Sequence, residues 1–448
     1  MAPTTSFQGP KGTRDFYPDR MAVRRHIESA WRSAAIDSGF SEIEGPMFEP
    51  LELYTVKSGQ EIVSQLFSFR RQGGEDEYAL RPEFTPTLAR MAAARGKSLA
   101  IPTKWFSIPN LFRAERPQRG RLREHIQWNV DVLGLDDATA DIEIISTALL
   151  ALERVGLGPD QVKVRLSHRG SIADVLVALG VPADRLQDAF LLLDRRDKLD
   201  EAEFRHGVLA LGLDDSAVDR FDQAARLTRS LDEPLEEIAR TLGVPESALC
   251  GLQEITTGLL EAGLSDWCVV DTGIVRGLAY YTGTVFEIFD AQGAERAVAG
   301  GGRYDRLVEL FGGPSTPACG FGMGDVVLSL VLEEHGLLGN DAGSDLLPRP
   351  DVFLIATSDV GAARLGGLLT SLRRGGFHAR RSHKSTRNVG KLLSEASRSR
   401  ARHALILGDE LTDGSVVLKD LEGGTQSTVS LEMLPELLDS AADEDPGS

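Results

Sequence analysis

Arginine and glutamate side chains are unusually dense in one short segment of the chain. Arg113 lies two residues before Glu115, and Arg121 lies two residues before Arg123. In an extended chain, this spacing places Arg113 with Glu115 on one face and Arg121 with Arg123 on another. Guanidinium groups bind phosphate oxygens through a rigid two-point fork. The segment therefore predicts either a phosphate-binding site or ion pairing within a surface hairpin.

Other common catalytic and phosphate-binding motifs are absent from the sequence. It contains no G-x-x-x-x-G-K-[ST] loop and no strand-borne G-x-G-x-x-G motif, and the glycine-rich residues 320–324 match neither pattern. The H-E-x-x-H metal motif and the G-x-S-x-G nucleophile motif are also missing. Arginine side chains are therefore the main candidates for chemistry at a phosphate.

The elements that must position these arginines can be predicted from the apolar pattern. Helical spacing predicts helices over residues 20–38, 86–95 and 138–155, and Gly39 ends the first of them. From residue 166 to 263 the apolar spacing stays helical and acidic residues are frequent. We therefore expect a mostly helical insertion at residues 166–263.

The pattern changes from helix to strand after the insertion. Residues 269–275 and 279–289 are rich in β-branched and aromatic residues, which predicts two strands. Residues 290–294 predict the connection to a further strand, and the glycines at 300–302 allow close approach of backbone or ligand. We expect these strands to complete a first domain at residues 1–336.

A second, smaller domain is expected in the last quarter of the chain. Residues 337–350 have the composition of a linker, and in residues 351–437 strands alternate with helices, which predicts a small α/β domain. Residues 438–448 form an acidic tail. Basic residues are frequent between 373 and 403, and such a run is commonly just a solvated surface. The predicted strands of this domain are residues 352–356, 403–407 and 416–418.

The bulk composition limits the possible classes of protein. A chain of 448 residues is expected to form two or three domains. The net charge of −18 argues against non-specific wrapping of nucleic acid, although a local basic face can still bind RNA. No apolar run reaches the roughly 20 residues of a membrane span, and the first 17 residues lack the apolar region of a secretory signal. We expect a cytoplasmic protein without membrane contact.

Several strings, in order along residues 11–437, resemble the class II aminoacyl-tRNA synthetases and their histidyl branch. Residues 39–46 (GFSEIEGP) resemble motif 1, and residues 112–121 (FRAERPQRGR) resemble motif 2. Residues 320–324 (GFGMG) match the opening of motif 3. The strings that resemble the histidyl branch are residues 11–15 (KGTRD), 80–85 (LRPEFT), 276–287 (RGLAYYTGTVFE) and 301–305 (GGRYD).

This resemblance implies an ATP site built from arginines. Arg113 matches the residue that holds the α-phosphate of ATP, and Arg121 and Arg123 match residues beside the distal phosphates. Glu115 belongs to the same motif 2 segment and is included in the expected ATP site. Arg276 matches the catalytic arginine that bridges the histidine carboxylate and the α-phosphate, where negative charge develops during the reaction. Arg276 and Arg113 are therefore the expected catalytic residues.

The resemblance also implies a histidine site. Oxygen acceptors would receive the substrate ammonium, which has three donors. Asp131 and Tyr281 match the pair that holds the imidazole ring in its neutral form. Structural salt bridges for Glu83 and Asp131, and an ordinary strand position for Tyr280, are the alternatives. The expected histidine-binding residues are Glu83, Thr85, Gln127, Asp131, Arg276, Tyr280 and Tyr281.

Three positions depart from the commonest family pattern. Val327 stands where many relatives have an arginine that packs against ATP, and Arg303 is one candidate to replace it. Ala279 replaces a frequent aspartate, and Asp131 replaces a frequent glutamate, so that the histidine pocket is shallower or contains a bridging water. We interpret these changes as those of a divergent but active branch.

We therefore predict an α+β protein with a class II synthetase-like antiparallel sheet flanked by helices, a helical insertion and a C-terminal α/β anticodon-binding domain. The resemblance implies a ligase that activates histidine with ATP, accompanied by Mg²⁺, and charges tRNA(His). It also implies a homodimer with motif 1 in its interface; the metal ligands stay unassigned. The alternative is a catalytically silent paralogue that binds histidine and regulates another enzyme. The arginines at 113, 121 and 276 and the C-terminal domain favour the ligase.

Overall fold

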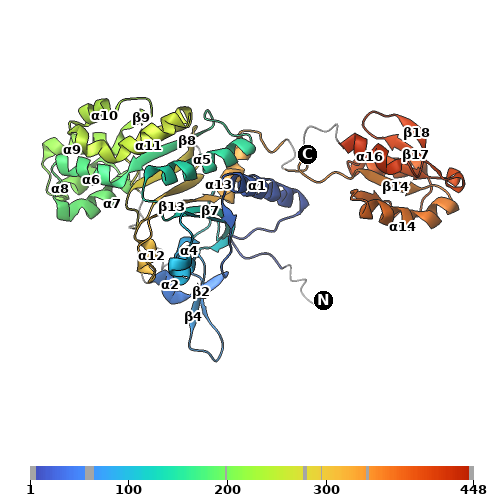
Figure 1. The fold of residues 1–448 in the computed structure, drawn as a ribbon, viewed down its shortest axis with the longest axis horizontal. Coiled ribbons are helices and arrows are strands. Elements are labelled where there is room, and N and C mark those ends of the chain that lie inside the picture. The colour runs from blue at the N-terminus through green and yellow to red at the C-terminus, as the bar shows by residue number, and fades with distance from the viewer. Residues whose placement is uncertain are drawn as a thin grey trace, which may run out of the picture. The chain divides into compact units, whose positions relative to one another are not determined.

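The computed structural model divides the chain into two compact units, Met1–Leu346 and Leu347–Ser448 (Figure 1). The boundary falls inside the linker expected at residues 337–350. The structure describes residues 7–55, 65–196, 199–275, 280–293, 295–339 and 343–442. Within them, no helix is both long and apolar enough to cross a membrane.

A large sheet forms the centre of the first unit. The described residues contribute ten strands, of which nine follow one another across the sheet and β6 pairs with β7. Most neighbours are antiparallel, as predicted, but β1 is parallel to β5 and β8 is parallel to β10. The strands in spatial order are β1 (Ser41–Glu42), β5 (Thr103–Ser107), β7 (Glu124–Leu133), β13 (Ala318–Gly324), β12 (Ala299–Arg303), β11 (Thr284–Asp290), β8 (Val162–His168), β10 (Cys268–Asp271) and β9 (Thr228–Ser230), with β6 (Asn110–Phe112) beside β7.

Three helices pack against the middle of this sheet: α1 (Pro18–Asp37), α5 (Ala138–Arg154) and α13 (Asp325–Glu334). The first two correspond to the helices predicted at 20–38 and 138–155. The indole of Trp31 stacks on Trp128 with ring centroids 6.0 Å apart, and Trp128 meets the ring of Phe321 edge-on at 5.1 Å. These buried rings fix the strands β7 and β13, which carry the candidate site, against the helical layer.

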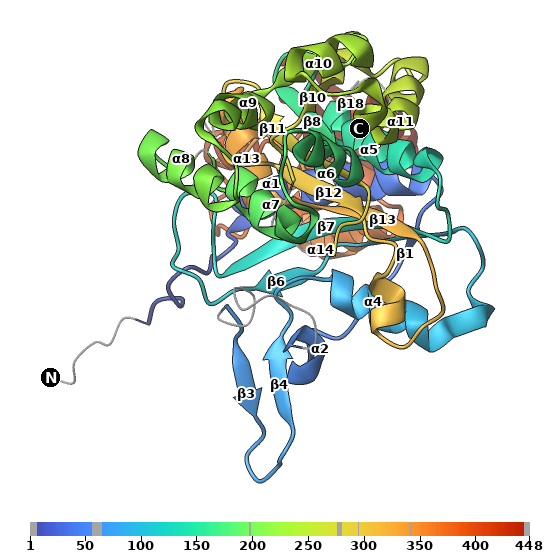
Figure 2. The same cartoon turned by 90° about the vertical axis from the view of Figure 1, so that its left-hand side faces the viewer.

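In the described residues between β8 and β10, the region expected to be a helical insertion, six helices form most of the segment. They gather in one group beside the sheet (Figure 2). The short strand β9 of the same segment joins the sheet edge. Part of the group has its own apolar core, in which Phe204 and Phe221 are fully buried. The helices are α6 (Arg169–Ala178), α7 (Leu186–Asp194), α8 (Glu201–Ala210), α9 (Asp215–Arg226), α10 (Leu235–Leu242) and α11 (Cys250–Glu261).

The strands around residues 269–290 are shorter than predicted. The strand expected at 269–275 ends at Asp271, because the Asp271 carboxylate accepts a hydrogen bond from the amide of Gly273 and forms a turn. Val275 is buried among the insertion helices instead of pairing in the sheet. The strand expected at 279–289 begins only at Thr284. The apolar, β-branched composition of these segments therefore predicts burial, but not every buried residue is in a strand.

A small three-stranded sheet and its helices lie beyond one end of the main sheet. The β3–β4 hairpin projects away from the rest of the unit (Figure 2). Thr85 begins α4, one residue before the predicted start. The elements of this region are β2 (Phe48–Pro50), α2 (Leu51–Thr55), β3 (Ser68–Arg70), β4 (Glu77–Leu80), α4 (Thr85–Arg95) and α12 (Leu307–Leu310).

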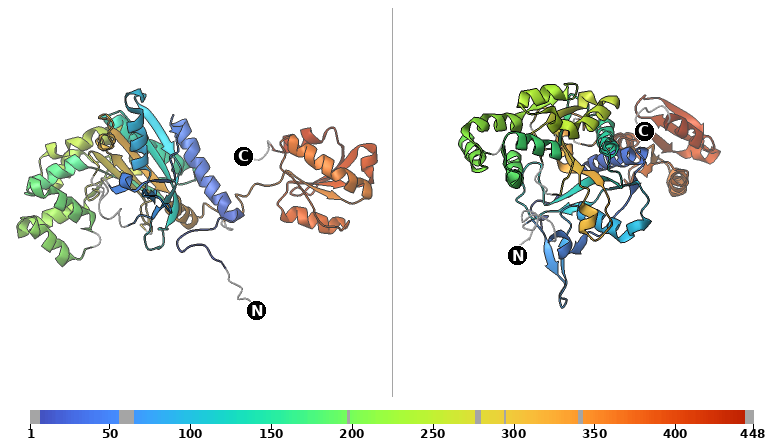
Figure 3. Two further views of the ribbon diagram at one scale, coloured as in Figure 1. Left: turned by 90° about the horizontal axis from the view of Figure 1, so that it is seen from below. Right: turned by 60° about the vertical axis from the view of Figure 1, so that its left-hand side comes forward.

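The second unit is the predicted small α/β domain. Alternate residues of β14 face opposite ways, so that Leu354 belongs to a core with α14 and α16 while Phe353 belongs to another with α15. Helices cover both faces of the sheet of this unit (Figure 3). Helix α16 continues past residue 437, and Leu438 is buried in the first of these cores. In spatial order the strands are β15 (Ala379–Arg381), β14 (Val352–Ala356), β16 (His403–Leu407), β17 (Ser415–Asp420) and β18 (Gln426–Ser430), and the helices are α14 (Asp359–Arg374), α15 (Val389–Arg398) and α16 (Leu434–Ala442).

Candidate active site

One cavity of about 720 Å³ lies over the strands β7, β12 and β13. It brings together most of the residues that the sequence analysis selected from distant segments. Glu115 and Arg123 are not among the lining residues, and Arg276 and Ala279 lie outside the described residues. The predicted residues that line the cavity are Glu83, Thr85, Arg113, Arg121, Gln127, Asp131, Tyr280 and Tyr281.

Strand periodicity and glycine explain how β7 presents its polar side chains to this cavity. Gln127 and Asp131 are four residues apart on β7 and therefore share one face of the sheet. On the neighbouring strand β13, Gly320 is paired with Asp131. A Cβ atom on Gly320 would collide with the carboxylate of Asp131, and one on Gly322 would lie 2.7 Å from Cδ of Gln127. The glycines of β13 thus provide the space that the polar side chains of β7 occupy.

Asp131 is a buried residue whose carboxylate has one hydrogen-bond donor beside it. Its side chain accepts a hydrogen bond from the hydroxyl of Tyr304. Burial raises the pKa of Asp131 to about 7, and the Tyr304 hydrogen bond opposes that rise. Tyr304 lies within the residue 301–305 string, although no role was predicted for it. The pairing makes Tyr304 a positioning residue for Asp131.

Glu83 and Arg113 form the second charged group of the cavity. Burial raises the pKa of Glu83, and the positive charge of Arg113 acts in the opposite direction. The Nε atom of Arg113 donates a hydrogen bond to the carbonyl of Pro82, at 3.0 Å. This bond orients the guanidinium and leaves its terminal nitrogens as donors toward a ligand. The geometry suits a substrate with a cationic group near Glu83 and an anionic group near Arg113.

The motif 2 arginines are arranged differently from the predicted alternation. Residues 113–123 form a hairpin, the arginine hairpin, which is closed by the hydrogen bond from the amide of Arg113 to the carbonyl of Arg123. Nη1 of Arg121 lies 2.6 Å from Oε2 of Glu115, so these two side chains pair across it. The guanidinium of Arg123 instead donates to the backbone carbonyl of Glu115 at 3.0 Å and to that of Lys11 at 3.4 Å. A tight turn with Gly120 at φ 71° separates the two strands of the hairpin. The prediction treated the segment as one continuous extended chain, and the turn breaks that alternation.

His125 is a further lining residue that the sequence analysis did not select. It lies on β7 between the arginine hairpin and Gln127. Burial lowers its pKa to about 3, and the positive charges of Arg113 and Arg14 lower it further. The imidazole is therefore neutral at physiological pH and adds a polar but uncharged ring to the cavity wall.

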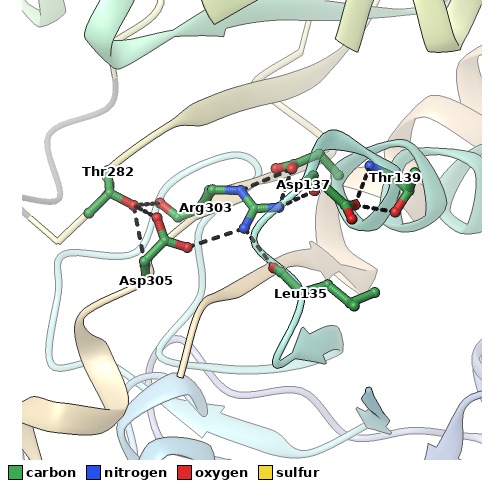
Figure 4. Close-up of polar contacts among 7 residues, drawn as sticks. Leu135, Asp137, Thr139, Thr282, Arg303 and Asp305 are labelled. Carbon is green, nitrogen blue, oxygen red and sulfur yellow. Dashed lines mark hydrogen bonds and ion pairs between the residues drawn. The ribbon is translucent and has the colours of Figure 1, made fainter. Parts of the chain in front are cut away.

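Arg303, the arginine proposed to replace the one missing at position 327, has a structural role instead. Its Nε donates to the buried carboxylate of Asp141 at 3.0 Å. The other nitrogens donate to the carbonyls of Leu135 at 2.8 Å and Asp137 at 2.7 Å (Figure 4). Arg303 is not among the residues that line the cavity, so the prediction for this residue was wrong. Because its nitrogens donate to Asp141 of α5 and to the loop before that helix, Arg303 ties β12 to α5.

The buried Arg303–Asp141 pair predicts a large effect on stability. Arg303→Met would leave the carboxylate of Asp141 buried without a counter-charge and should lower the free energy of unfolding by about 3–5 kcal/mol. Urea denaturation followed by circular dichroism measures the change. The double variant Arg303→Met/Asp141→Leu, which removes both charges, should lose less stability than the single variant. A single variant as stable as the wild type would contradict the proposed role of the pair.

The fold is that of a synthetase. The crystal structure of histidyl-tRNA synthetase from Nostoc sp. PCC 7120 superimposes with a TM-score of 0.81 at 24% identity, covering 98% of this chain and 100% of that one. A family model described as histidyl-tRNA synthetase matches residues 12–325, and one described as anticodon binding domain matches residues 352–440.

Two curated relatives agree over nearly the whole chain. A histidine–tRNA ligase of Opitutus terrae is 39% identical, over 97% of this chain and 98% of its own length. One from Natronomonas pharaonis is 38% identical, over 96% of this chain and 97% of its own length. The chain belongs to the histidyl-tRNA synthetase family, and its expected substrates include ATP.

Proposed function

We propose that this protein activates L-histidine with ATP and transfers the histidyl group to the 3′ end of tRNA(His). A carboxylate oxygen of histidine attacks the α-phosphorus of ATP, and the bond to the β-phosphate breaks to release pyrophosphate. The terminal ribose hydroxyl of the tRNA then attacks the carbonyl carbon of histidyl-adenylate and releases AMP. The supporting observation is one cavity that contains both a buried acidic group and an arginine group.

The histidine end of the cavity is proposed to be formed by Asp131 and Tyr281, with Glu83, Thr85 and Gln127 receiving the ammonium. An aspartate that accepts from one ring nitrogen, and a phenol that donates to the other, favours a neutral imidazole over other side chains. The alternative of structural salt bridges finds no support in the geometry, because no ion pair involves Glu83 or Asp131 among the described residues. Tyr280 is proposed to support Tyr281, since their rings lie 4.9 Å apart.

The ATP end is proposed to be formed by Arg113 and Arg121, with Glu115 holding Arg121 in place. Arg123 would act by fixing the backbone of the same hairpin, and Arg276 would bridge the carboxylate and the α-phosphate. We also propose that Mg²⁺ accompanies ATP, because this ion binds mainly through substrate phosphates and a few carboxylates. Glu287 lines the cavity and offers oxygen ligands of the required type.

Amino-acid-dependent exchange of pyrophosphate into ATP tests this proposal. The purified protein is assayed with each of the twenty amino acids, and exchange is expected with histidine alone. Absence of exchange, together with histidine binding seen by calorimetry, would favour the silent regulatory paralogue.

We further propose that the protein forms a homodimer and works in the cytoplasm. Sedimentation equilibrium measures the oligomeric state.

The C-terminal unit is proposed to bind the anticodon arm of the tRNA. Basic side chains gather in a hollow along one face of α15 and the loop before it, where Lys384, Lys391 and Arg398 are among the lining residues. Lysine and arginine at such a position would neutralise backbone phosphates. This part of the basic segment therefore lines a hollow. The sequence alone is equally consistent with basic residues on an ordinary solvated surface.

The hollow provides a test of the tRNA-binding face. Lys391→Ala/Arg398→Ala should raise the KM for tRNA about tenfold through lost phosphate contacts, with a smaller salt dependence. Pyrophosphate exchange without tRNA should stay normal. The variant Arg95→Ala/Lys97→Ala removes the same charge from an exposed site in the first unit and serves as the control. Equal effects of the two double variants on tRNA charging would argue against binding at the hollow.

A further inference from the structure

Val327 is an aliphatic residue in the cavity wall at a position where the family pattern has an arginine. It lies in the first turn of α13, is only 7% exposed and contributes to the apolar core as well as to the cavity wall. The family pattern places an arginine that packs against ATP at this position. In this chain, α13 therefore supplies an aliphatic surface where a planar cation is expected, and a nucleotide would need that cation from another element.

Arg296 reaches the same part of the cavity from a different element. It precedes β12 and lines the cavity together with Val327 and Gly120. A Cβ atom on Gly120 would lie 3.5 Å from Cγ2 of Val327 and 3.7 Å from Cδ of Arg296. The aliphatic part of the Arg296 side chain and the side chain of Val327 thus converge on one point of the arginine hairpin.

The backbone around Arg296 is fixed beside the start of α13. The amide of Gly324, immediately before α13, donates to the carbonyl of Val298 at 3.2 Å, and the amide of Val298 donates to Ile288 at 2.7 Å. The neighbouring Glu295 side chain is only 3% exposed and forms an ion pair with Arg119. These contacts hold the segment in place on both sides of Arg296, while its own guanidinium makes no hydrogen bond or ion pair with any described residue.

Four other arginines in this part of the first unit bind carboxylates. The guanidinium of each already has a charged protein partner, whereas that of Arg296 has none among the described residues. These pairs are Arg14 with Asp325, Arg119 with Glu295 and Glu334, Arg121 with Glu115, and Arg303 with Asp141.

We propose that Arg296 replaces the arginine absent at position 327 and packs its guanidinium plane against the base of ATP. This inference rests on the proposed use of ATP and adds a residue that the motif pattern does not identify. A guanidinium stacks on a planar ring through dispersion and cation–π attraction, which an ammonium reproduces poorly. Arg296 is thus a nucleotide-binding residue supplied by the segment before β12 instead of by α13.

Kinetic measurements on Arg296 variants test the proposal. Arg296→Ala should raise the KM for ATP in pyrophosphate exchange about tenfold and leave the KM for histidine unchanged. Arg296→Lys should recover only part of the loss, because it restores the charge without the plane. Introducing Val327→Arg into Arg296→Ala should lower the KM for ATP again, because it returns an arginine to the same part of the cavity. Arg220→Ala, an exposed arginine of α9, is the matched control.

Direct calorimetric titration with ATP separates this proposal from the proposed function. It requires no turnover, so a wild type without histidine-dependent exchange would refute the ligase while Arg296→Ala still reports on nucleotide binding. An ATP affinity of Arg296→Ala equal to that of the wild type and of Arg220→Ala would overturn the role of Arg296. An equal loss of histidine and ATP affinity would also overturn it, since it would indicate a general disturbance of the cavity.

Discussion

Asp131→Ala is expected to raise the KM for histidine about a hundredfold and to change the KM for ATP little. A hydrogen bond to a charged group contributes about 1.5–3 kcal/mol, and the imidazole would lose its acceptor in a buried site. The variant also leaves the hydroxyl of Tyr304 without its partner. Pyrophosphate exchange with varied histidine and varied ATP measures both constants. Similar losses for the two substrates would show that Asp131 does not contact the imidazole.

The pKa of Asp131 adds a pH dependence to this prediction. In the free protein, burial raises the pKa to about 7, so the carboxylate becomes protonated below that pH and cannot accept from the imidazole. The KM for histidine should therefore rise as pH falls below about 7. Tyr304→Phe removes the hydrogen bond that lowers this pKa, so the rise should begin at a higher pH. An unchanged pH profile in Tyr304→Phe would exclude positioning of Asp131 by Tyr304.

The same pKa predicts a pH dependence of stability. The folded protein keeps the proton of Asp131 up to about pH 7, whereas an unfolded chain loses it near the ordinary value of 3.8. The stabilising contribution is therefore complete below about pH 4 and is lost as pH rises toward 7. Asp131→Asn does not titrate, so it should gain stability relative to the wild type between pH 5 and pH 8 in urea denaturation. A constant difference between the two proteins would contradict the raised pKa.

Arg113→Ala is expected to lower the rate of adenylate formation about a thousandfold. A preorganised donor aimed at charge that develops in the transition state contributes about 10²–10³ in rate, and a bidentate guanidinium also positions the phosphate. Arg113→Lys should recover little of this rate, because an ammonium lacks the two-point fork. Single-turnover measurement of pyrophosphate release follows the chemical step directly.

Two controls separate the chemical role of Arg113 from a structural one. Arg116→Ala changes an exposed arginine of the same hairpin that does not line the cavity, and it should retain near-normal rates. Histidine should still bind to Arg113→Ala, although more weakly, because the positive charge that lowers the pKa of Glu83 is removed. Turnover of Arg113→Ala within tenfold of the wild type would remove Arg113 from the catalytic step.

Local periodicity and composition were sufficient to predict the ranges of many helices and strands. Helices α1, α4 and α5 and strands β14 and β16 agree with their predicted ranges to within two residues at either end. These elements have a regular apolar pattern that reflects one buried face or a fully buried strand. The strand predicted at 269–275 was too long, because Val275 is buried in the insertion core and not in a ladder, and the strand predicted at 279–289 begins only at Thr284.

For the site, the sequence determined which side-chain types are present, and the ordered motifs indicated which of them share a function. The tertiary structure alone decided their partners. Tyr304 donates to Asp131, Arg303 binds Asp141, and Arg296 lines the cavity beside Val327 because strands distant in the sequence lie next to one another in the sheet. The periodicity of a sequence predicts which face of a helix or strand a residue is on, but it does not predict which other segment of the chain packs against that face. For that reason Arg303, which was one candidate to contact the nucleotide, is a buried structural cation, while Arg296 lines the cavity in which we propose that the nucleotide binds.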